Sequence, residues 1–198
     1  MHIEARLRRR CFRRQGEDEG FTLIELLVVL VVIGVLLAVA IPTFLSTTKN
    51  ANNSAAQSNL QTANTASTGY YTQANLTYSN IAAGGLTSGL GGVGGGVSAI
   101  SQQDNGMTFV SGAPSTAVNV ISLWTDNSTS IVMASYSPGT KDCWYLIDLK
   151  APSSTVWGGL DVGTYYSVDT NVVSSACQAS GTAPGTASTP QTGGYPAG

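Results

Sequence analysis

The sequence has few of the side chains that usually perform acid–base chemistry. Its one histidine is His2, and charged residues make up only 10% of the 198 positions. The acidic residues form no pair at a spacing typical of a catalytic site. General acid–base catalysis relies most often on histidine or on paired carboxylates. The composition therefore argues against an enzyme and predicts no cofactor.

Metal and nucleotide sites also lack their usual signals. The three cysteines contain no C-x-x-C spacing, which such zinc sites commonly use. Gly89, Gly91 and Gly94 satisfy the pattern G-x-G-x-x-G, but no strand-like run precedes them and no Gly-Lys-Ser/Thr is present. A phosphate-binding loop requires that context. We predict no metal site and no nucleotide site.

The longest apolar run, residues 21–45, contains Glu25 as its only ionisable side chain. As a helix, about 25 residues with a rise of about 1.5 Å each cross a hydrocarbon core. A carboxylate inside such a helix costs about 2.5–3.5 kcal/mol, so Glu25 needs a partner. The next basic residue, Lys49, is out of reach along the helix, whereas cleavage after Gly20 would expose the α-amino group of Phe21. The alternative is a plain membrane anchor whose acid snorkels to the interface.

The letters GFTLIE at residues 20–25, followed by LLVV, closely resemble the class III signal of type IV pilins and type II secretion pseudopilins. This resemblance implies that a prepilin peptidase cuts between Gly20 and Phe21 and N-methylates the new terminus. It also implies that Glu25 pairs with the terminal amine of a neighbouring subunit during filament assembly. Gly34 and Pro42 match recurrent positions of the family's first helix. The resemblance covers residues 1–71 and is strongest over residues 20–42.

The leader, residues 1–20, carries a cluster of arginines directly before the apolar run. Positive charge beside a membrane span stays on the cytoplasmic side, which explains the cluster without a nucleic acid ligand. The acidic residues at positions 17–19 depart from the basic residues of many familiar pilins. After cleavage three lysines remain against seven acidic side chains. Because phosphate binding needs clustered basic residues, we expect no direct nucleic acid binding.

Cys143 and Cys177 are the two cysteines that remain after the leader, with Cys11, is removed. An even number of cysteines in an exported segment predicts a disulfide. Two free buried thiols, or half of a metal site, are the alternatives. Type IV pilins commonly close a carboxy-terminal loop with such a bond, so Cys143 and Cys177 resemble the borders of that disulfide-bonded region.

The rest of the sequence predicts an α+β fold, in which a long N-terminal helix packs on a small antiparallel β-sheet, as in type IV pilins. The helix is expected to have an apolar half, residues 21–45, that spans the membrane and later forms the filament core. A polar half, residues 46–71, is expected to lie on the sheet through a narrow stripe of mostly small residues. The members of this stripe are Ala56, Leu60, Ala63, Ser67 and Tyr70.

Residues 72–180 are expected to form the globular head and residues 181–198, rich in proline and glycine, a flexible tail. A glycine-rich surface loop is expected over residues 69–106. Four runs have the composition of strands, and a fifth, short edge strand is expected within residues 155–173. The four runs are Met107–Val110, Ala117–Trp124, Ser130–Ser135 and Cys143–Leu149.

Pro42 removes one backbone donor and crowds the preceding turn of the helix. A kink or a locally opened helix is therefore expected near residues 39–42. In filaments of the resembled family the region between the residues matching Gly34 and Pro42 is often unwound. The alternative is a helix that proline merely bends, and the sequence leaves both open.

Three functions fit these features. The first, which we favour, is the structural subunit, in particular the major pilin, of a type IV pilus serving adhesion, motility or uptake. The second is a pseudopilin of a type II secretion or competence system, and the third is a membrane-tethered binding domain that never polymerises. The resemblance implies a single-pass inner-membrane protein that later joins a cell-surface pilus. Its expected partners are further copies of the chain, prepilin peptidase, the inner-membrane assembly platform and, indirectly, the assembly ATPases, with membrane lipid before assembly.

Overall fold

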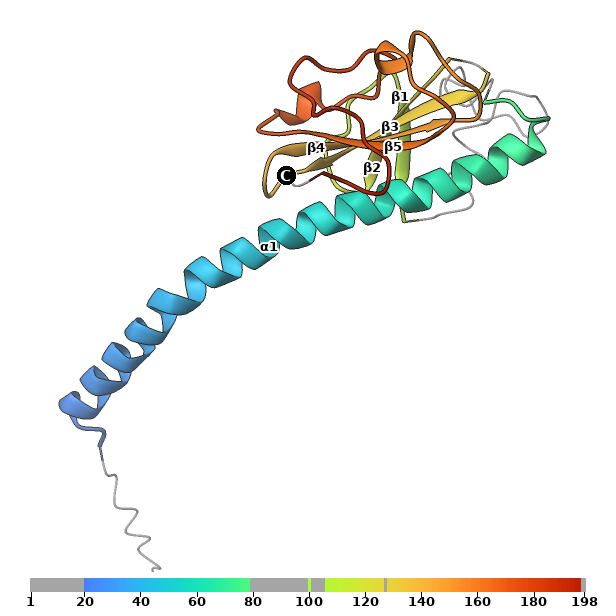
Figure 1. Ribbon diagram of the computed structural model, residues 1–198. Helices are drawn as coiled ribbons and strands as arrows, with labels where there is room; N and C mark the ends of the chain where they lie inside the picture. Colours follow the sequence, from blue (N-terminus) through green and yellow to red (C-terminus); the bar gives the residue numbers. More distant parts are fainter. Residues whose placement is uncertain (1–19, 79–99, 101–105, 127, 197–198) are drawn as a thin grey trace, which may run out of the picture. The chain divides into compact units, whose positions relative to one another are not determined.

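The computed structural model describes residues 20–78, 100, 106–126 and 128–196. It divides into two compact units, residues 1–43 and residues 44–198, each of which is treated separately below. The leader up to residue 19 and most of the predicted glycine-rich loop lie outside the described residues. Figure 1 shows a long helix, α1, and a five-stranded sheet, which confirms the predicted α+β class.

Helix α1 spans Leu23–Gln73 without interruption. Pro42 lies inside it, and the hydroxyl of Thr43 donates to the carbonyl oxygens of Ala40 at 2.9 Å and of Val39 at 3.3 Å. The helical assignment continues through residues 39–42, so the expected locally opened segment is not present in this single chain.

The sheet has the strand order β1-β2-β3-β4-β5. The strands are β1 Thr108–Ser111, β2 Val120–Thr125, β3 Ser130–Ser137, β4 Asp142–Leu149 and β5 Gly163–Asp169. All four predicted strand runs overlap a strand, and β5 is the edge strand predicted within residues 155–173.

One pairing differs from the predicted antiparallel sheet, because β1 and β2 run parallel while the other three pairs are antiparallel. A parallel pair needs a crossover connection in place of a tight turn. Residues 112–119 form this connection, and the backbone N–H of Ser115 within it donates to the Cys177 carbonyl at 2.7 Å. The sequence carries no signal for this crossover, since the turn residues in it are equally typical of a hairpin.

The head, the unit of residues 44–198, has hydrophobic clusters on both faces of its sheet. On one face the α1 stripe residues Ala56, Leu60 and Ala63 are fully buried against Ile121 and Trp144, as the stripe predicted. Full burial of one large aliphatic side chain such as Leu60 stabilises the fold by roughly 1.5–3 kcal/mol.

On the opposite face, residues that follow β4 in the sequence cover the strands. This second cluster contains Val132, Tyr145, Trp157 and Cys177. It includes the 3₁₀ turn η1, Val156–Gly158, and a second turn, η2 Ser174–Ala176, precedes Cys177. Because both faces are covered, every residue of β3 and of β4 is buried. This explains why the strands lack a clean apolar and polar alternation in the sequence.

The turn between β3 and β4 is fixed to α1 by Asn53. The Asn53 side chain accepts hydrogen bonds from Thr140 Oγ1 at 2.6 Å and from Trp144 Nε1 at 3.3 Å, and donates to Asp142 Oδ2 at 3.3 Å. Gly139 in this turn approaches the helix so closely that a Cβ there would meet the side chain of Asn52 at 2.8 Å. These contacts dock the helix to one end of the sheet.

A buried polar group, Asp148 in β4, connects the sheet to the segment after α1. Its carboxylate accepts from the Tyr78 hydroxyl at 2.9 Å and pairs with Lys150 at 2.7 Å. Burial, and then the charge of Asp148, raises the pKa of Tyr78 far above its usual range. The Tyr78 phenol therefore stays protonated as a donor at all physiological pH values.

The described part of the predicted tail, residues 181–196, makes specific contacts with the sheet. Tyr166 in β5 and Gln191 exchange backbone hydrogen bonds of 2.8 and 3.0 Å. The Tyr195 ring lies edge-on to Trp144, with ring centroids 5.5 Å apart, and packs on Tyr166 at 4.7 Å. Proline and glycine exclude regular elements from this segment, but they do not prevent it from docking along an edge strand.

Gly181 allows the closest backbone approach in this segment. A Cβ built there would collide with the indole ring of Trp124, and this aromatic ring is not the far end of a flexible chain. We expect Gly181→Ala to lower the free energy of unfolding of the head by about 1–3 kcal/mol, the usual cost of overpacking. Urea unfolding followed by tryptophan fluorescence measures this.

The matched control is Gly185→Ala, because a Cβ at Gly185 meets nothing within 4 Å. We expect this variant to unfold at the urea concentration of the unmodified chain. Equal stability of the Gly181→Ala and Gly185→Ala variants would contradict the close packing of residue 181 on Trp124.

Candidate processing and assembly site

The predicted cleavage site lies where the chain enters α1. Gly20 and Phe21 precede the helix and are exposed, with 86% of the Phe21 surface accessible. A Cβ at Gly20 would meet nothing within 4 Å. The bond between these two residues is therefore open to an enzyme in the isolated chain.

Thr22 and Glu25 form a reciprocal pair at the start of α1. Glu25 Oε2 accepts from the Thr22 hydroxyl at 2.7 Å and from the Thr22 backbone N–H at 2.9 Å. In return, the Glu25 backbone N–H donates to Thr22 Oγ1 at 3.3 Å. This arrangement is a capping box, which satisfies backbone donors that a helix leaves unpaired in its first turn.

This role of Thr22 is absent from the sequence predictions, which give Glu25 only a cation as its partner. The signal was present, because Thr-x-x-Glu directly before an apolar run is the sequence pattern of a capping box. Hydrogen bonds from Thr22 satisfy one carboxylate oxygen but do not neutralise its charge, and among the described residues no basic side chain forms an ion pair with Glu25.

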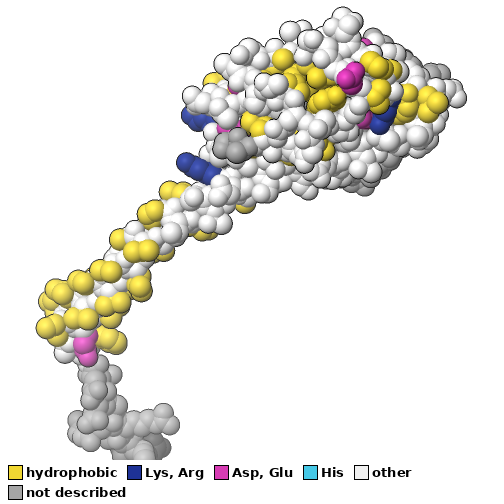
Figure 2. All heavy atoms as spheres, in the orientation of Figure 1, with side chains coloured by type: hydrophobic (Ala, Val, Ile, Leu, Met, Phe, Trp, Pro, Cys, Tyr) yellow, Lys and Arg dark blue, Asp and Glu magenta, His cyan; other side chains and the backbone are white. Residues whose placement is uncertain are grey.

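Behind this site, the first part of α1 is covered with exposed apolar side chains. Figure 2 shows hydrophobic side chains along the N-terminal half of the helix. The exposed fractions within it include 81% for Leu23, 64% for Leu36 and 71% for Phe44. An 18-residue window of this helix has a mean hydropathy of 3.2 and is 0% buried. By length and composition the helix is able to cross a membrane.

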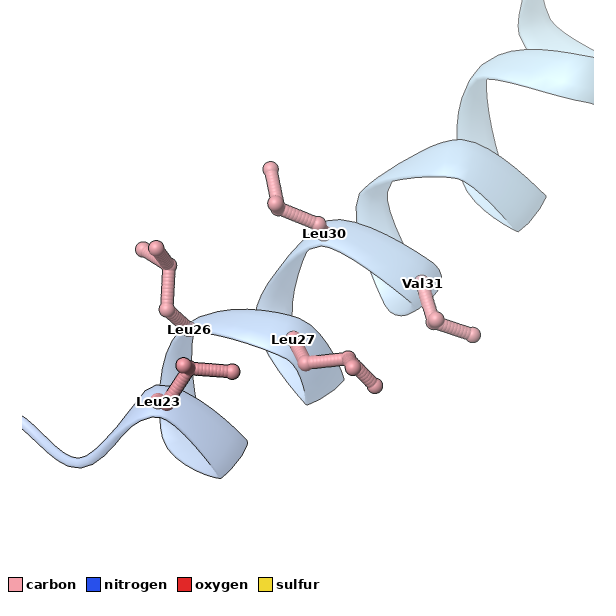
Figure 3. A pocket seen from close by; sticks show the side chains of 5 residues that line it. All are labelled: Leu23, Leu26, Leu27, Leu30 and Val31. Atoms are coloured by element: carbon pink, nitrogen blue, oxygen red, sulfur yellow. The ribbon is translucent and has the colours of Figure 1, made fainter.

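A shallow apolar groove lies on the helix beside Glu25. Leu23, Leu26, Leu27, Leu30 and Val31 line it. Figure 3 shows Leu26 and Leu30 on one side of the helix and Leu27 and Val31 on another. The groove runs between rows of side chains with the i, i+4 spacing that helices use to pack on one another.

Gly34 and Pro42 lie farther along the same helix, and the structure does not bring them next to Glu25. A Cβ at Gly34 would meet nothing within 4 Å, so the chain by itself does not require glycine there. Pro42 lacks the N–H that a regular helix would donate to the carbonyl of Ala38. The assembly roles expected for both residues stay predictions.

Cys143 and Cys177 form a disulfide in the head, with Cα atoms 5.4 Å apart and 34 positions of separation in the sequence. Both cysteines are fully buried. The bond ties the start of β4 to the segment after η2 and encloses β5 in its loop. The predicted disulfide is present.

Within the described residues of the head, no group of three or more His, Cys, Asp and Glu side chains gathers in a way that would hold a metal ion. A small hollow near residues 152–161 is lined by polar and apolar side chains, among them Ser153, Leu160 and Asp161.

Comparison with known proteins agrees with this assignment. Residues 18–41 match the model of the prokaryotic N-terminal methylation motif. No curated protein and no solved structure matches the chain. The matched residues include the expected cleavage site, the capping box and the apolar groove, and the match supports the class III signal predicted from the sequence.

Proposed function

We propose that this chain, a pilin-like or pseudopilin-like subunit by its class III signal, is the major structural subunit of a type IV pilus. One observation carries the proposal: the signal leads directly into a helix that exposes apolar side chains and holds a single carboxylate in its first turn. A filament of packed helices would bury that apolar surface, which the isolated chain leaves open.

Processing is the first step of the proposed function. A prepilin peptidase would cut the exposed bond between Gly20 and Phe21, release the basic leader and N-methylate Phe21. The cut precedes the apolar run, so the helix would survive it, unlike the apolar region of an ordinary secretory signal. The apolar helix and the signal indicate membrane anchoring before assembly.

Assembly would use the new terminus as a cation. The α-amino group of Phe21 on one subunit would pair with Glu25 of its neighbour, whose carboxylate is otherwise costly in an apolar setting. Both bonds from Thr22 go to Glu25 Oε2, which leaves Oε1 to accept from the incoming amine. Thr22 would thus hold the carboxylate in place while the neighbouring amine neutralises it.

The apolar groove gives the helix a surface for a second copy of itself. In the proposed filament, α1 of a neighbour would lie against Leu26 and Leu30 and remove them from lipid or water. Small residues such as Gly34 would permit close approach of two helices. An inner-membrane assembly platform and cytoplasmic ATPases would drive the process, and the heads would face outward for adhesion, motility or uptake.

Cell fractionation with an antibody against the head tests this proposal. We expect most of the processed chain in filaments sheared from the cell surface, labelled along their length in electron micrographs. Processed chain confined to the membrane fraction, with no labelled surface filament, would contradict a major pilin and indicate a pseudopilin.

A further inference from the structure

The edge of the sheet at β5 is covered by the segment that the composition predicted to be flexible. We call residues 184–196 the C-terminal strap. Besides the exchange between Tyr166 and Gln191, the Ser188 backbone N–H donates to the Val168 carbonyl at 2.8 Å, and Ser188 Oγ accepts from the Val168 N–H at 2.9 Å. The strap therefore occupies the backbone groups through which β5 would accept another strand.

The geometry of the ladder identifies which β5 residues face outward. Tyr166 and Val168 both direct their N–H and C=O groups to the strap. In an antiparallel ladder these directions alternate with a period of two residues. Thr164 therefore also directs its backbone groups away from β4, and these alternate positions form one continuous strand-addition edge.

Beyond the backbone bonds, a few side-chain contacts hold the strap in place. Tyr195 packs on Trp144 and Tyr166, and the Thr186 hydroxyl donates to Asp169 Oδ2 at 2.9 Å. The Ser167 hydroxyl donates to the Ser188 carbonyl at 2.7 Å, and Ala187 packs against the second cluster. Most of the remaining strap residues are proline, glycine, serine, threonine and alanine, which bury little apolar area. A segment with so few anchors opens at a lower free energy than the strands that it covers.

We infer that the β5 edge is a strand-addition surface for a second copy of this chain, and that the C-terminal strap holds this surface closed. The strand reads GTYYSVD and contains no proline, a composition that pairs readily when an edge is released. Release of Tyr195 would also uncover the aromatic rings of Trp144 and Tyr166.

The surface fits a second copy because the edge is complementary to itself. Two β5 strands paired antiparallel about Tyr166 would bring Thr164 opposite Val168 of the other copy. Asp169, the only charged residue of β5, would then lie opposite Gly163, so like charges would not face each other. Such a two-fold contact uses the same patch on both copies.

The test uses the full chain in detergent, with micelles in excess over protein, and measures molar mass by light scattering over a concentration series. Deletion of residues 184–198, and separately Tyr195→Ala, is expected to lower the apparent dissociation constant for dimerisation at least about tenfold relative to the unmodified chain. Adding Thr164→Pro to either variant is expected to restore the monomer, because proline removes an outward-facing N–H without removing a bond to β4.

Tyr71→Ala is the matched control. Tyr71 is another half-buried tyrosine of the same core and packs on Tyr78. Removing its ring loosens the core without uncovering β5, so this variant is expected to stay monomeric. Tryptophan fluorescence shows whether the head of each variant is folded. If the deletion variant does not fold, the Tyr195→Ala variant alone tests the inference.

Three outcomes would overturn the inference. One is a folded Tyr195→Ala variant that stays monomeric over the whole concentration series. Another is dimerisation that Thr164→Pro does not reduce. The third is a Tyr71→Ala control that dimerises as strongly as Tyr195→Ala, because association would then follow from a general loss of stability.

Discussion

Replacing Glu25 by alanine is expected to abolish filament assembly while leaving cleavage after Gly20 and membrane anchoring intact. The carboxylate is the only ionisable group in residues 21–45, and the neighbour's Phe21 amine would lose its counter-charge in an apolar filament core. A charge unpaired in such a setting costs about 2.5–3.5 kcal/mol, which corresponds to about a 100-fold loss for each subunit added. Quantitative immunoblots of the sheared and membrane fractions measure the share of the chain that is assembled into filaments.

Two further variants separate the charge of Glu25 from its part in the capping box. Glu25→Gln keeps the size and hydrogen-bonding capacity of the side chain but removes the charge, and is expected to fail in assembly as the alanine variant does. Thr22→Val removes both bonds of the Thr22 hydroxyl and keeps the charge. Since a helix cap contributes about 1 kcal/mol, this variant is expected to assemble at a level reduced only about five-fold. Normal filaments from Glu25→Gln would refute the pairing of Glu25 with the Phe21 amine.

Removing the disulfide is expected to give the largest loss of head stability. In the chain-entropy model, a loop closed over 34 positions of separation stabilises the fold by roughly 3–4 kcal/mol. We therefore expect the double variant Cys143→Ala, Cys177→Ala to unfold at a much lower urea concentration. All three tryptophans, Trp124, Trp144 and Trp157, lie in the head, so tryptophan fluorescence reports head unfolding without a signal from the first part of α1.

The single variant Cys177→Ala serves as a comparison, since it also loses the bond but leaves one free buried thiol at Cys143. Both variants are expected to lose similar stability if loop closure dominates. The processed chain should still reach the membrane in both cases, because the signal and the apolar run are unchanged. A double variant within about 1 kcal/mol of the unmodified chain would show that the other contacts of the loop, such as Trp157 with Tyr145, hold it without the bond.

Much of the architecture was predictable because local patterns determine it. The i, i+4 and i, i+7 spacing of Ala56, Leu60 and Ala63 predicted the buried face of α1, and all three are fully buried. Runs of β-branched and aromatic residues between turn residues predicted the strands to within a few positions. These are short-range signals, in which each residue's role depends on near neighbours in the sequence.

The features that were missed depend on contacts between distant segments. The parallel pairing of β1 with β2 follows from the path of residues 112–119, which Ser115 anchors to Cys177. The strap docks because Tyr195 packs on Trp144, which lies far away in the sequence. Neither partner follows from local composition, because proline and glycine content does not indicate which distant residues a segment packs against.

The candidate site shows the opposite case, because its missed residue was local. Thr22 precedes Glu25 by three positions, and their capping box follows from sequence spacing alone. Glu25 also has a second predicted role, as the counter-charge of an amine. The two roles are compatible, since one carboxylate oxygen accepts from Thr22 and the other is left for an amine.

The most direct test of the proposed function is the intact mass and N-terminal sequence of this chain in filaments sheared from cells. We predict a chain that begins at methylated Phe21, lacks residues 1–20 and carries Cys143 and Cys177 in oxidised form. Filaments whose subunits retain the leader, or sheared filaments that lack this chain although it is processed in the membrane, would contradict the account.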